Sequence, residues 1–437
     1  MGEPSGPAAR QLRPTSVLPF AAWALLLVLQ LVSPDKVWSW LLVALSFLIG
    51  IAYGWACMLR DQVNATRRTL GTWVVVGDQI REQFTLINGG LLPVLWARVH
   101  DRSDAPGYHV DRVETASPGD RRTWHTFGMC QRRGVFHLGP WDLEMGDPLG
   151  FFRVMHRYGE SATIVVYPRA SHLPAIELPR GRAPGRSTSS DRALEDTMLV
   201  GGSRDYAPGD PLRRVQWKAS ARHDRLIVHE FDREPSGDLW LILDLHATVQ
   251  AGQEAESTVE YGIILTASLA AQFLRQGERR AVGLATSGCA PIVIPPARGQ
   301  AQMWTILEAL ALAEPSSDVP LADLLRQAGP ILGTGRSLVI LTPSQDPAWV
   351  ASLLPLMAAG NAPTALLLDA TTFDPPAGSA GAMMGLRGLL AQQRVPSTVL
   401  SQGYPFRPID KIRRQRTEWR MLSGSGRVIR VEVEEEV

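Results

Sequence analysis

The sequence has few cysteines and lacks several common motifs of enzyme and metal sites. Its three cysteines, Cys57, Cys130 and Cys289, lie far apart, and none belongs to a Cys-x-x-Cys pair. This spacing argues against a disulfide framework and a structural zinc site, and it fits a reducing compartment. The chain also lacks a P-loop, a His-Glu-x-x-His helix and a Gly-x-Ser-x-Gly turn. We therefore expect no catalytic residue and no cofactor, and we favour a binding protein over an enzyme.

An excess of one charge is also missing. The chain has 44 lysines and arginines against 43 aspartates and glutamates, which leaves a formal net charge of +1. Without a strong positive field, it is not expected to bind nucleic acid. His100, His125 and His137 fall on stretches of alternating polarity, but nothing in their spacing indicates a metal site. We interpret them as half-exposed residues of strands.

Long apolar runs occur near the N-terminus. Residues 17–32 are almost purely apolar, and residues 37–59 form a second run after the interruption Ser33-Pro34-Asp35-Lys36. The second run is long enough to cross a bilayer, and the first reaches that length with its flanks. We predict two transmembrane helices over residues 17–60. A cleaved signal peptide ending near Ser33 is the alternative, and it is disfavoured because a second apolar run follows at once.

Positive charges flank this helix pair at both ends. The turn between the helices carries Asp35 and Lys36, whereas the flanking segments carry Arg10, Arg13, Arg60, Arg67 and Arg68. By the positive-inside rule, both termini and the main domains are expected in the cytoplasm, with the turn outside. The prediction is a plasma-membrane protein held in the lipid bilayer by two spans, with a disordered tail over residues 1–16.

Residues 68–167 follow a period of two. Ile80, Phe84 and Leu86 share one face of a predicted strand, on which Glu82 is the exception. Short alternating stretches separated by turn residues indicate an antiparallel sandwich of the immunoglobulin-like type. The expected strands are 73–76, 80–87, 95–100, 122–127, 134–138 and 163–167. A linker rich in proline, arginine, glycine and serine follows over residues 168–200.

Residues 201–234 combine more unlike residue types than any other segment. Asp210 and Pro211 mark the start of a helix predicted over 211–221, and a strand is predicted over 226–231. Arginines and acids nearly balance here, which suggests that Arg204, Arg214 and Arg222 form bidentate ion pairs with Asp205, Asp210, Glu230 or Asp232. We favour a structural ion-pair network. A surface for a partner protein and a phosphate or nucleotide site are the alternatives, and the last lacks a glycine-rich loop.

Residues 235–405 alternate between strand and helix patterns. The run 239–243 is apolar throughout, as a strand buried on both faces should be. Such alternation predicts an α/β domain with a mostly parallel, doubly wound sheet. Further strands are expected at 281–286, 338–341, 365–369 and 398–400, and helices at 256–276, 300–313, 347–358 and 384–392.

The C-terminal segment, 406–437, is first basic and then acidic. The basic stretch 407–420 is predicted to form an exposed helix face. A strand is expected at 428–431, before an acidic tail.

Segment 201–234 also carries a resemblance. The pattern Arg204-x-Tyr206-x-x-Gly209-Asp210, followed by Trp217-Lys218-Ala219-Ser220-Ala221-Arg222 and by the strand that contains Glu230, resembles the signature of the domain of unknown function 58 family. Upstream, Asp147-Pro148-Leu149-Gly150-Phe151-Phe152 is similar to a second landmark of that family. The residues that the resemblance marks as partner-binding or structural are Arg204, Tyr206, Gly209, Asp210, Trp217, Lys218, Arg222 and Glu230.

The resemblance implies a membrane-anchored bacterial or archaeal protein with a von Willebrand factor A-like α/β domain. Members of the family are often encoded beside MoxR-type AAA+ ATPases and transglutaminase-like membrane proteins. The expected function is therefore an interaction or scaffold module that works with such an ATPase in the assembly or maturation of envelope proteins.

The same resemblance raises the question of a metal. In that fold a metal-dependent adhesion site begins with Asp-x-Ser-x-Ser after the first strand, and oxygen ligands converge there on magnesium. Here Asp244 and Thr248 match, but His246 replaces the first serine, and Pro343 stands where a second acidic residue is expected. We expect no metal. The alternative function is an enzyme or metal-dependent binder that holds an anionic ligand through Asp244, Arg204 and Arg222.

Overall fold

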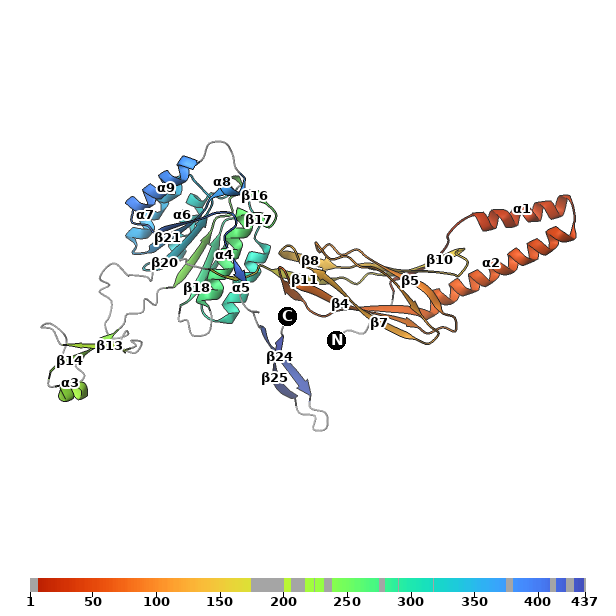
Figure 1. Ribbon diagram of the computed structural model, residues 1–437, viewed down its shortest axis with the longest axis horizontal. Coiled ribbons are helices and arrows are strands. Elements are labelled where there is room, and N and C mark those ends of the chain that lie inside the picture. The colour runs from red at the N-terminus through yellow and green to blue at the C-terminus, as the bar shows by residue number, and fades with distance from the viewer. Residues whose placement is uncertain are drawn as a thin grey trace. The chain divides into compact units, whose positions relative to one another are not determined.

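The computed structural model describes residues 7–173, 200–205, 217–223, 225–231, 238–274, 280–289, 291–316, 318–374, 380–408, 414–421 and 428–435. The chain divides into two compact units (Figure 1). Unit 1 contains Met1–Arg169, Leu310–Leu312 and Ile409–Val437, and unit 2 contains Ala170–Ala309 and Ala313–Pro408.

The described residues of Met1–Arg169 in unit 1 form three small sheets. Their strand orders are β1-β10-β9-β5-β6, β2-β4-β7 and β3-β11-β8, and the pairing is antiparallel except between β3 and β11. The strands are β1 (Ala9–Pro14), β2 (Val63–Thr69), β3 (Trp73–Val75), β4 (Gln79–Asn88), β5 (Val94–Asp101), β6 (Asp111–Ala116), β7 (Arg121–Met129), β8 (Gly134–Leu138), β9 (Trp141–Gly146), β10 (Phe152–Tyr158) and β11 (Ala162–Tyr167). All six predicted strands are confirmed, and five others were not predicted.

One of the unpredicted strands corrects the expectation of a disordered tail over residues 1–16. Ala9–Pro14 forms β1 and pairs antiparallel with β10, from Ala9 opposite Arg157 to Pro14 opposite Phe152. The sequence of β1 shows no apolar alternation that would reveal a strand. Its order comes from backbone hydrogen bonds to the edge of β10 and from Leu12, which packs against the core.

The core of unit 1 is aromatic at its centre. Trp141 stacks on Tyr158 with ring centroids 3.9 Å apart, and it meets Phe84 edge-to-face at 5.5 Å. Glu82, the exception on its strand face, is fully buried beside Arg67. Arg67 Nη2 lies 2.6 Å from Glu82 Oε2, and Arg67 Nη1 lies 2.8 Å from Asp101 Oδ1. A buried carboxylate is tolerated where a guanidinium and further hydrogen bonds compensate its charge.

Two helices leave unit 1 side by side (Figure 1). They are α1 (Leu18–Val32) and α2 (Lys36–Gln62), and Asp35 caps α2 by accepting a hydrogen bond from the Val37 amide. Trp23 Nε1 donates to Ser46 Oγ across the pair at 2.7 Å. In the part of the chain that the structure describes, one helix, α2, is long and apolar enough to cross a membrane.

The helix pair is an insertion within unit 1. β1 comes directly before α1, β2 follows α2, and both strands belong to the same unit. The last turns of α2 are part of its core, since Ala52, Ala56 and Leu59 are fully buried there. Both ends of the pair are therefore fixed to one folded body.

Unit 2 contains a six-stranded sheet in the order β19-β18-β15-β20-β21-β22. Neighbouring strands are parallel, except that β19 is antiparallel to β18 at one edge. The strands are β15 (Leu239–Leu243), β18 (Val282–Thr286), β19 (Ile292–Ala297), β20 (Ser337–Thr342), β21 (Ala362–Leu368) and β22 (Ser397–Leu400). The predicted strands are confirmed, and β19 was not predicted.

Helices cover both faces of this sheet (Figure 1). Leucines and other apolar residues of α6, α7 and α9 pack with β15, β20 and β21 in one core, and α4 lies on the opposite face, where Gly262 is close to Leu243 and Leu368. The helices are α4 (Thr258–Phe273), α5 (Gln300–Leu312), α6 (Leu321–Leu332), α7 (Ala348–Ala358), α8 (Ala370–Phe373) and α9 (Ala380–Gln392). Of these, α6 and α8 were not predicted.

Further pairs of antiparallel strands are described. β12 (Ser171–His172) pairs with β23 (Arg407–Pro408), β13 (Val200–Asp205) pairs with β14 (Ile227–Phe231), and β24 (Arg414–Met421) pairs with β25 (Val428–Glu435).

Two predictions are wrong here. The basic stretch 407–420 was expected as a helix, but its described residues form β23 and most of β24. The acidic residues do not form a tail beyond the last strand, because those up to Glu435 belong to β25. That strand pairs with β24, and Arg414 lies opposite Glu435. A basic stretch can form a strand where a partner strand supplies its backbone hydrogen bonds, as β25 does for β24. The start of the predicted linker, at Ala170 and Ser171, is buried in unit 2.

Candidate functional site

The carboxyl edge of the parallel sheet in unit 2 is the natural place to look for a site. From β15 the chain goes to β18 on one side, and later returns to β20 on the other side. Strand order therefore reverses between β15 and β20. In doubly wound sheets, ligands bind outside the carboxyl ends of the strands at such a switch point.

Asp244 lies at this point, directly after β15, and it is buried. Its Oδ2 accepts a hydrogen bond from Thr342 Oγ1 at 2.6 Å, and its Oδ1 accepts one from the His246 amide at 3.0 Å. Burial raises the pKa of the Asp244 carboxyl group, while these hydrogen bonds act in the opposite direction. Asp244 thus joins the ends of β15 and β20.

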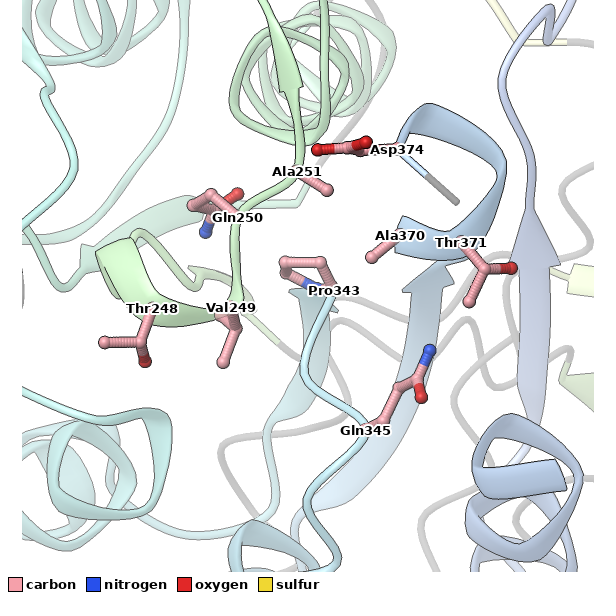
Figure 2. A pocket seen from close by; sticks show the side chains of 9 residues that line it. All are labelled: Thr248, Val249, Gln250, Ala251, Pro343, Gln345, Ala370, Thr371 and Asp374. Atoms are coloured by element: carbon pink, nitrogen blue, oxygen red, sulfur yellow. The ribbon is translucent and has the colours of Figure 1, made fainter. Parts of the chain in front are cut away.

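A pocket of about 370 Å³ opens beside this link. Figure 2 shows Pro343 and Gln345, on the segment that leaves β20, between the 248–251 segment and α8. The lining residues come from three strand ends and are Thr248, Val249, Gln250, Ala251, Pro343, Gln345, Ala370, Thr371 and Asp374.

The lining is neutral apart from one acid. Gln250 links the end of β15 to the start of α4, because its Nε2 donates to the Asp244 carbonyl oxygen and its Oε1 accepts from Thr258 Oγ1. Thr371 is similarly engaged, since its amide and its hydroxyl both donate to Asp369 Oδ1. Among the lining residues the charged one is Asp374, and none is basic. The pocket is therefore suited to neutral or cationic polar groups better than to an anion.

The residues do not fit the magnesium site that the fold resemblance implies. A hard cation needs several oxygen ligands that are free to converge on it. Here the Thr342 hydroxyl donates to Asp244, and Thr248 Oγ1 lies 2.8 Å from His246 Nδ1. In the part of the chain that the structure describes, no group of three His, Cys, Asp or Glu side chains comes together. Asp244 acts as a capping residue of the strand end.

The structure describes some of the predicted signature residues but not all of them. Tyr206, Gly209 and Asp210 lie outside the described residues. Arg204 lies on β13 opposite Val228, and Glu230 lies on β14 opposite Gly202.

The remaining signature residues lie on α3 (Trp217–His223), where Trp217 is 62% exposed and Arg222 is also exposed. Lys218 is on the same helix. The convergence of Asp244 with Arg204 and Arg222 stays a prediction.

Sequence reasoning missed most of the pocket. It singled out Thr248 but not Gln250, Gln345, Thr371 or Asp374. These residues follow β15, β20 and β21, so polar residues just after apolar runs were the available signal. α8 was not predicted, and its position was therefore unknown.

Comparison with known proteins supports the family resemblance. A family model described as "Protein of unknown function DUF58" matches residues 202–333. The uncharacterized protein YeaD of Bacillus subtilis is 26% identical over 271 residues, which cover 60% of this chain and 66% of that protein. An uncharacterized protein of Mycobacterium tuberculosis is 29% identical over 112 residues, which cover 25% of this chain and 35% of that protein. The chain thus spans just under two thirds of the first relative and about a third of the second.

Solved structures give only weak likenesses. The complex of zinc 2-glycoprotein with prolactin inducible protein matches at a TM-score of 0.19 and 8% identity, over 23% of this chain and 92% of that chain. The DNA glycosylase AlkC of Pseudomonas fluorescens matches at 0.18 and 15% identity, over 34% of this chain and 42% of that chain. Neither likeness carries a conclusion about fold or function. The family match, in contrast, confirms the resemblance seen in the sequence, because residues 202–333 match the DUF58 family model.

Proposed function

We propose that this protein is a membrane-anchored interaction module whose two units face the cytoplasm. The pocket at the switch point of unit 2 carries the proposal. It is open, its lining is mostly neutral, and the acid beside it, Asp244, is used in the fold. Such a site can hold a segment of a partner.

The connectivity of unit 1 supports a two-span anchor. If α2 crosses the bilayer, its Lys36 end lies on the far side, while β2 stays with unit 1. β1 belongs to the same unit, so α1 must bring the chain back. A single crossing would place the two halves of one folded body on opposite sides of the membrane. Arg13 before α1 and Arg68 after α2 favour the cytoplasm for that body.

We extend the proposal to the fold types. The paired antiparallel sheets of unit 1 support an immunoglobulin-like sandwich, although the parallel pair β3–β11 departs from a purely antiparallel one. In unit 2, the parallel sheet with β15 at its centre and helices on both faces supports a von Willebrand factor A-like domain.

The family resemblance suggests the partner. A MoxR-type AAA+ ATPase is the first candidate, and a transglutaminase-like membrane protein is the second. We propose that the module works with the ATPase in assembly or maturation of envelope proteins. This step rests on association within the family and not on the chemistry of the site.

The alternative is an enzyme or metal-dependent binder of an anionic ligand. The position and volume of the pocket are compatible with a small-molecule site. Its single charged lining residue, Asp374, would however repel an anion. The interaction module is therefore the better supported proposal.

The test is co-purification of the detergent-solubilised full chain with a MoxR-type ATPase from the same genome, with and without ATP. We expect recovery to depend on nucleotide and to fall about tenfold or more for Thr371→Arg, which fills the pocket. Thr305→Arg, at an exposed position of α5, is the matched control and should leave recovery unchanged. Equal recovery of both variants, or none of the ATPase with the native chain, would refute the proposal.

A further inference from the structure

A second cavity, of about 560 Å³, lies at the base of the helix pair in unit 1. Its walls come from three elements: Phe20 and Trp23 of α1, Ile49 and Tyr53 of α2, and Phe152 at the start of β10. The Phe152 ring meets Phe20 at 5.9 Å and Tyr53 at 5.6 Å, both edge-to-face. In Figure 1, β10 lies at the end of the unit from which the helices project.

The chemistry of the walls excludes most polar ligands. Ser46 lines the cavity, but its hydroxyl donates to the Leu42 carbonyl oxygen and accepts from Trp23 Nε1. The remaining lining is apolar or aromatic, apart from the hydroxyl of Tyr53. A ligand that gains from this cavity must therefore bring apolar surface.

The surroundings indicate where such a ligand comes from. Both helices expose large apolar side chains, among them Leu25, Val28, Trp40, Val43 and Phe47, each more than half exposed. Surfaces of this kind are stable in hydrocarbon and not in water. The cavity thus opens where phospholipid chains are the available apolar molecules.

Positive charge lies one residue further along the strands, where the side chains leave the opposite face of the sheet from Phe152 and β1 forms the edge of that sheet. Arg13 on β1 is directly opposite Arg153 on β10, next to the pair Pro14 and Phe152. Arg153 Nη1 is paired with Glu144 Oε1 at 2.7 Å, whereas the exposed Arg13 has no ion pair among the described residues. Like charges directly opposite each other on neighbouring strands are unfavourable, and an anion beside them relieves the repulsion.

We propose that the cavity holds one acyl chain of an anionic glycerophospholipid, with the phosphate near Arg13. The proposal rests on the membrane anchor proposed above. It also gives a role to the landmark segment 147–152: Asp147 accepts hydrogen bonds from the amides of Leu149 and Phe152 and so fixes the turn that presents Phe152 to the helices. The lipid then joins the helix pair to the β-sheets.

The chain offers a matched pair of variants. A side chain added at Gly50, which lines the cavity, meets no atom within 4 Å. The same holds for Gly54, one helical turn further on, which is not part of the lining. Leucine is the better helix former at both positions, so neither change should unfold α2. Gly50→Leu fills the cavity and Gly54→Leu does not.

The experiment uses the full chain in nanodiscs that contain phosphatidylglycerol with a diazirine at the end of one acyl chain. After irradiation, we expect adducts concentrated on the cavity residues, at least about tenfold fewer for Gly50→Leu, and no change for Gly54→Leu. Tenfold corresponds to losing the burial of roughly two methylene groups. Arg13→Gln should reduce labelling by phosphatidylglycerol about fivefold relative to phosphatidylcholine, as for one surface cation.

Extraction of native membranes with alkaline carbonate is the separate test of insertion. If the protein stays in the membrane but adducts spread evenly over Leu25, Val28 and Trp40, or Gly50→Leu labels like the native chain, the lipid is only annular and the cavity proposal is wrong. If Arg13→Gln leaves the lipid preference unchanged, the assigned phosphate position is wrong. If carbonate releases the protein, both the anchor and the cavity proposal fail.

Discussion

The Thr342 hydroxyl donates to the Asp244 carboxylate at 2.6 Å, and this one hydrogen bond connects the carboxyl ends of β20 and β15. Both side chains are buried. The same carboxylate also receives the His246 amide. The residue that most resembled a metal ligand in the sequence therefore already has partners within the protein.

The first prediction concerns the charge of Asp244. Because the pKa of its carboxyl group is raised in the folded state, its contribution to stability is present below the ordinary value of 3.8 and is lost as pH rises through the folded pKa. Asp244→Asn removes the buried charge and keeps hydrogen bonding, so it should be at least as stable as the native chain at pH 7. Asp244→Ala leaves the Thr342 hydroxyl and the His246 amide unpaired and should cost about 1–3 kcal/mol.

Thermal unfolding of the detergent-solubilised protein measures both changes. Thr342→Val should resemble Asp244→Ala, because it removes the same link. If Asp244→Asn is as damaging as Asp244→Ala, the negative charge itself is required, which would indicate a bound cation and contradict our interpretation.

The second prediction concerns Arg67, which compensates Glu82 and Asp101. Its side chain is 5% exposed, and both carboxylates are fully buried. Arg67→Met should destabilise the protein by about 3–5 kcal/mol, because it leaves two buried carboxylates without a cation. Arg98→Met breaks the exposed pair with Asp111 and is the control, with little change expected. Equal midpoints of unfolding for the two variants would show that the buried network adds no stability.

These cases show what the sequence could and could not predict. Continuous apolar runs were sufficient to predict β15 and α2, since such a pattern is local. It could not pair Glu82 with Arg67, because that contact depends on the register between β2 and β4. Apolar patterns also could not locate β1, because β1 is held as a strand by its pairing with β10.

The helix prediction for the C-terminal segment was wrong for the same reason. The residues of β24 include many arginines, and their strand form depends on a partner strand, β25, that local sequence does not reveal. In the candidate site, Asp244 was recognised from its position after a strand. The partner Thr342 and the lining residue Thr371 lie in other segments, which only the fold brings near it.

The third prediction concerns pH. His156, opposite Arg10 on β1, is fully buried, and burial, with Arg10 next in effect, lowers its pKa from 6.5 to about 4. The native state therefore binds fewer protons than the unfolded chain between these values. This contribution is fully present above pH 6.5 and is lost as pH falls through 4, a change of about 3 kcal/mol. His156→Leu should flatten the stability profile in that window, whereas His125→Leu, at an exposed position, should not. Parallel profiles for all three proteins would contradict this assignment.

The last prediction concerns the topology of the helix pair, and it follows from the connectivity of β1, α1, α2 and β2. In a background with the three native cysteines replaced by serine, Asp35→Cys places a thiol in the turn between the helices. A membrane-impermeant maleimide added to intact cells should label this thiol, because the turn lies outside when unit 1 lies inside. Ser117→Cys, in the loop between β6 and β7, should be labelled only after the membrane is opened. Labelling of Ser117→Cys alone in intact cells would place unit 1 outside, and labelling of both thiols would mean that the pair does not cross. Protection of both would mean that the pair does not cross, because a single crossing is forbidden by the strands that hold its two ends in one unit.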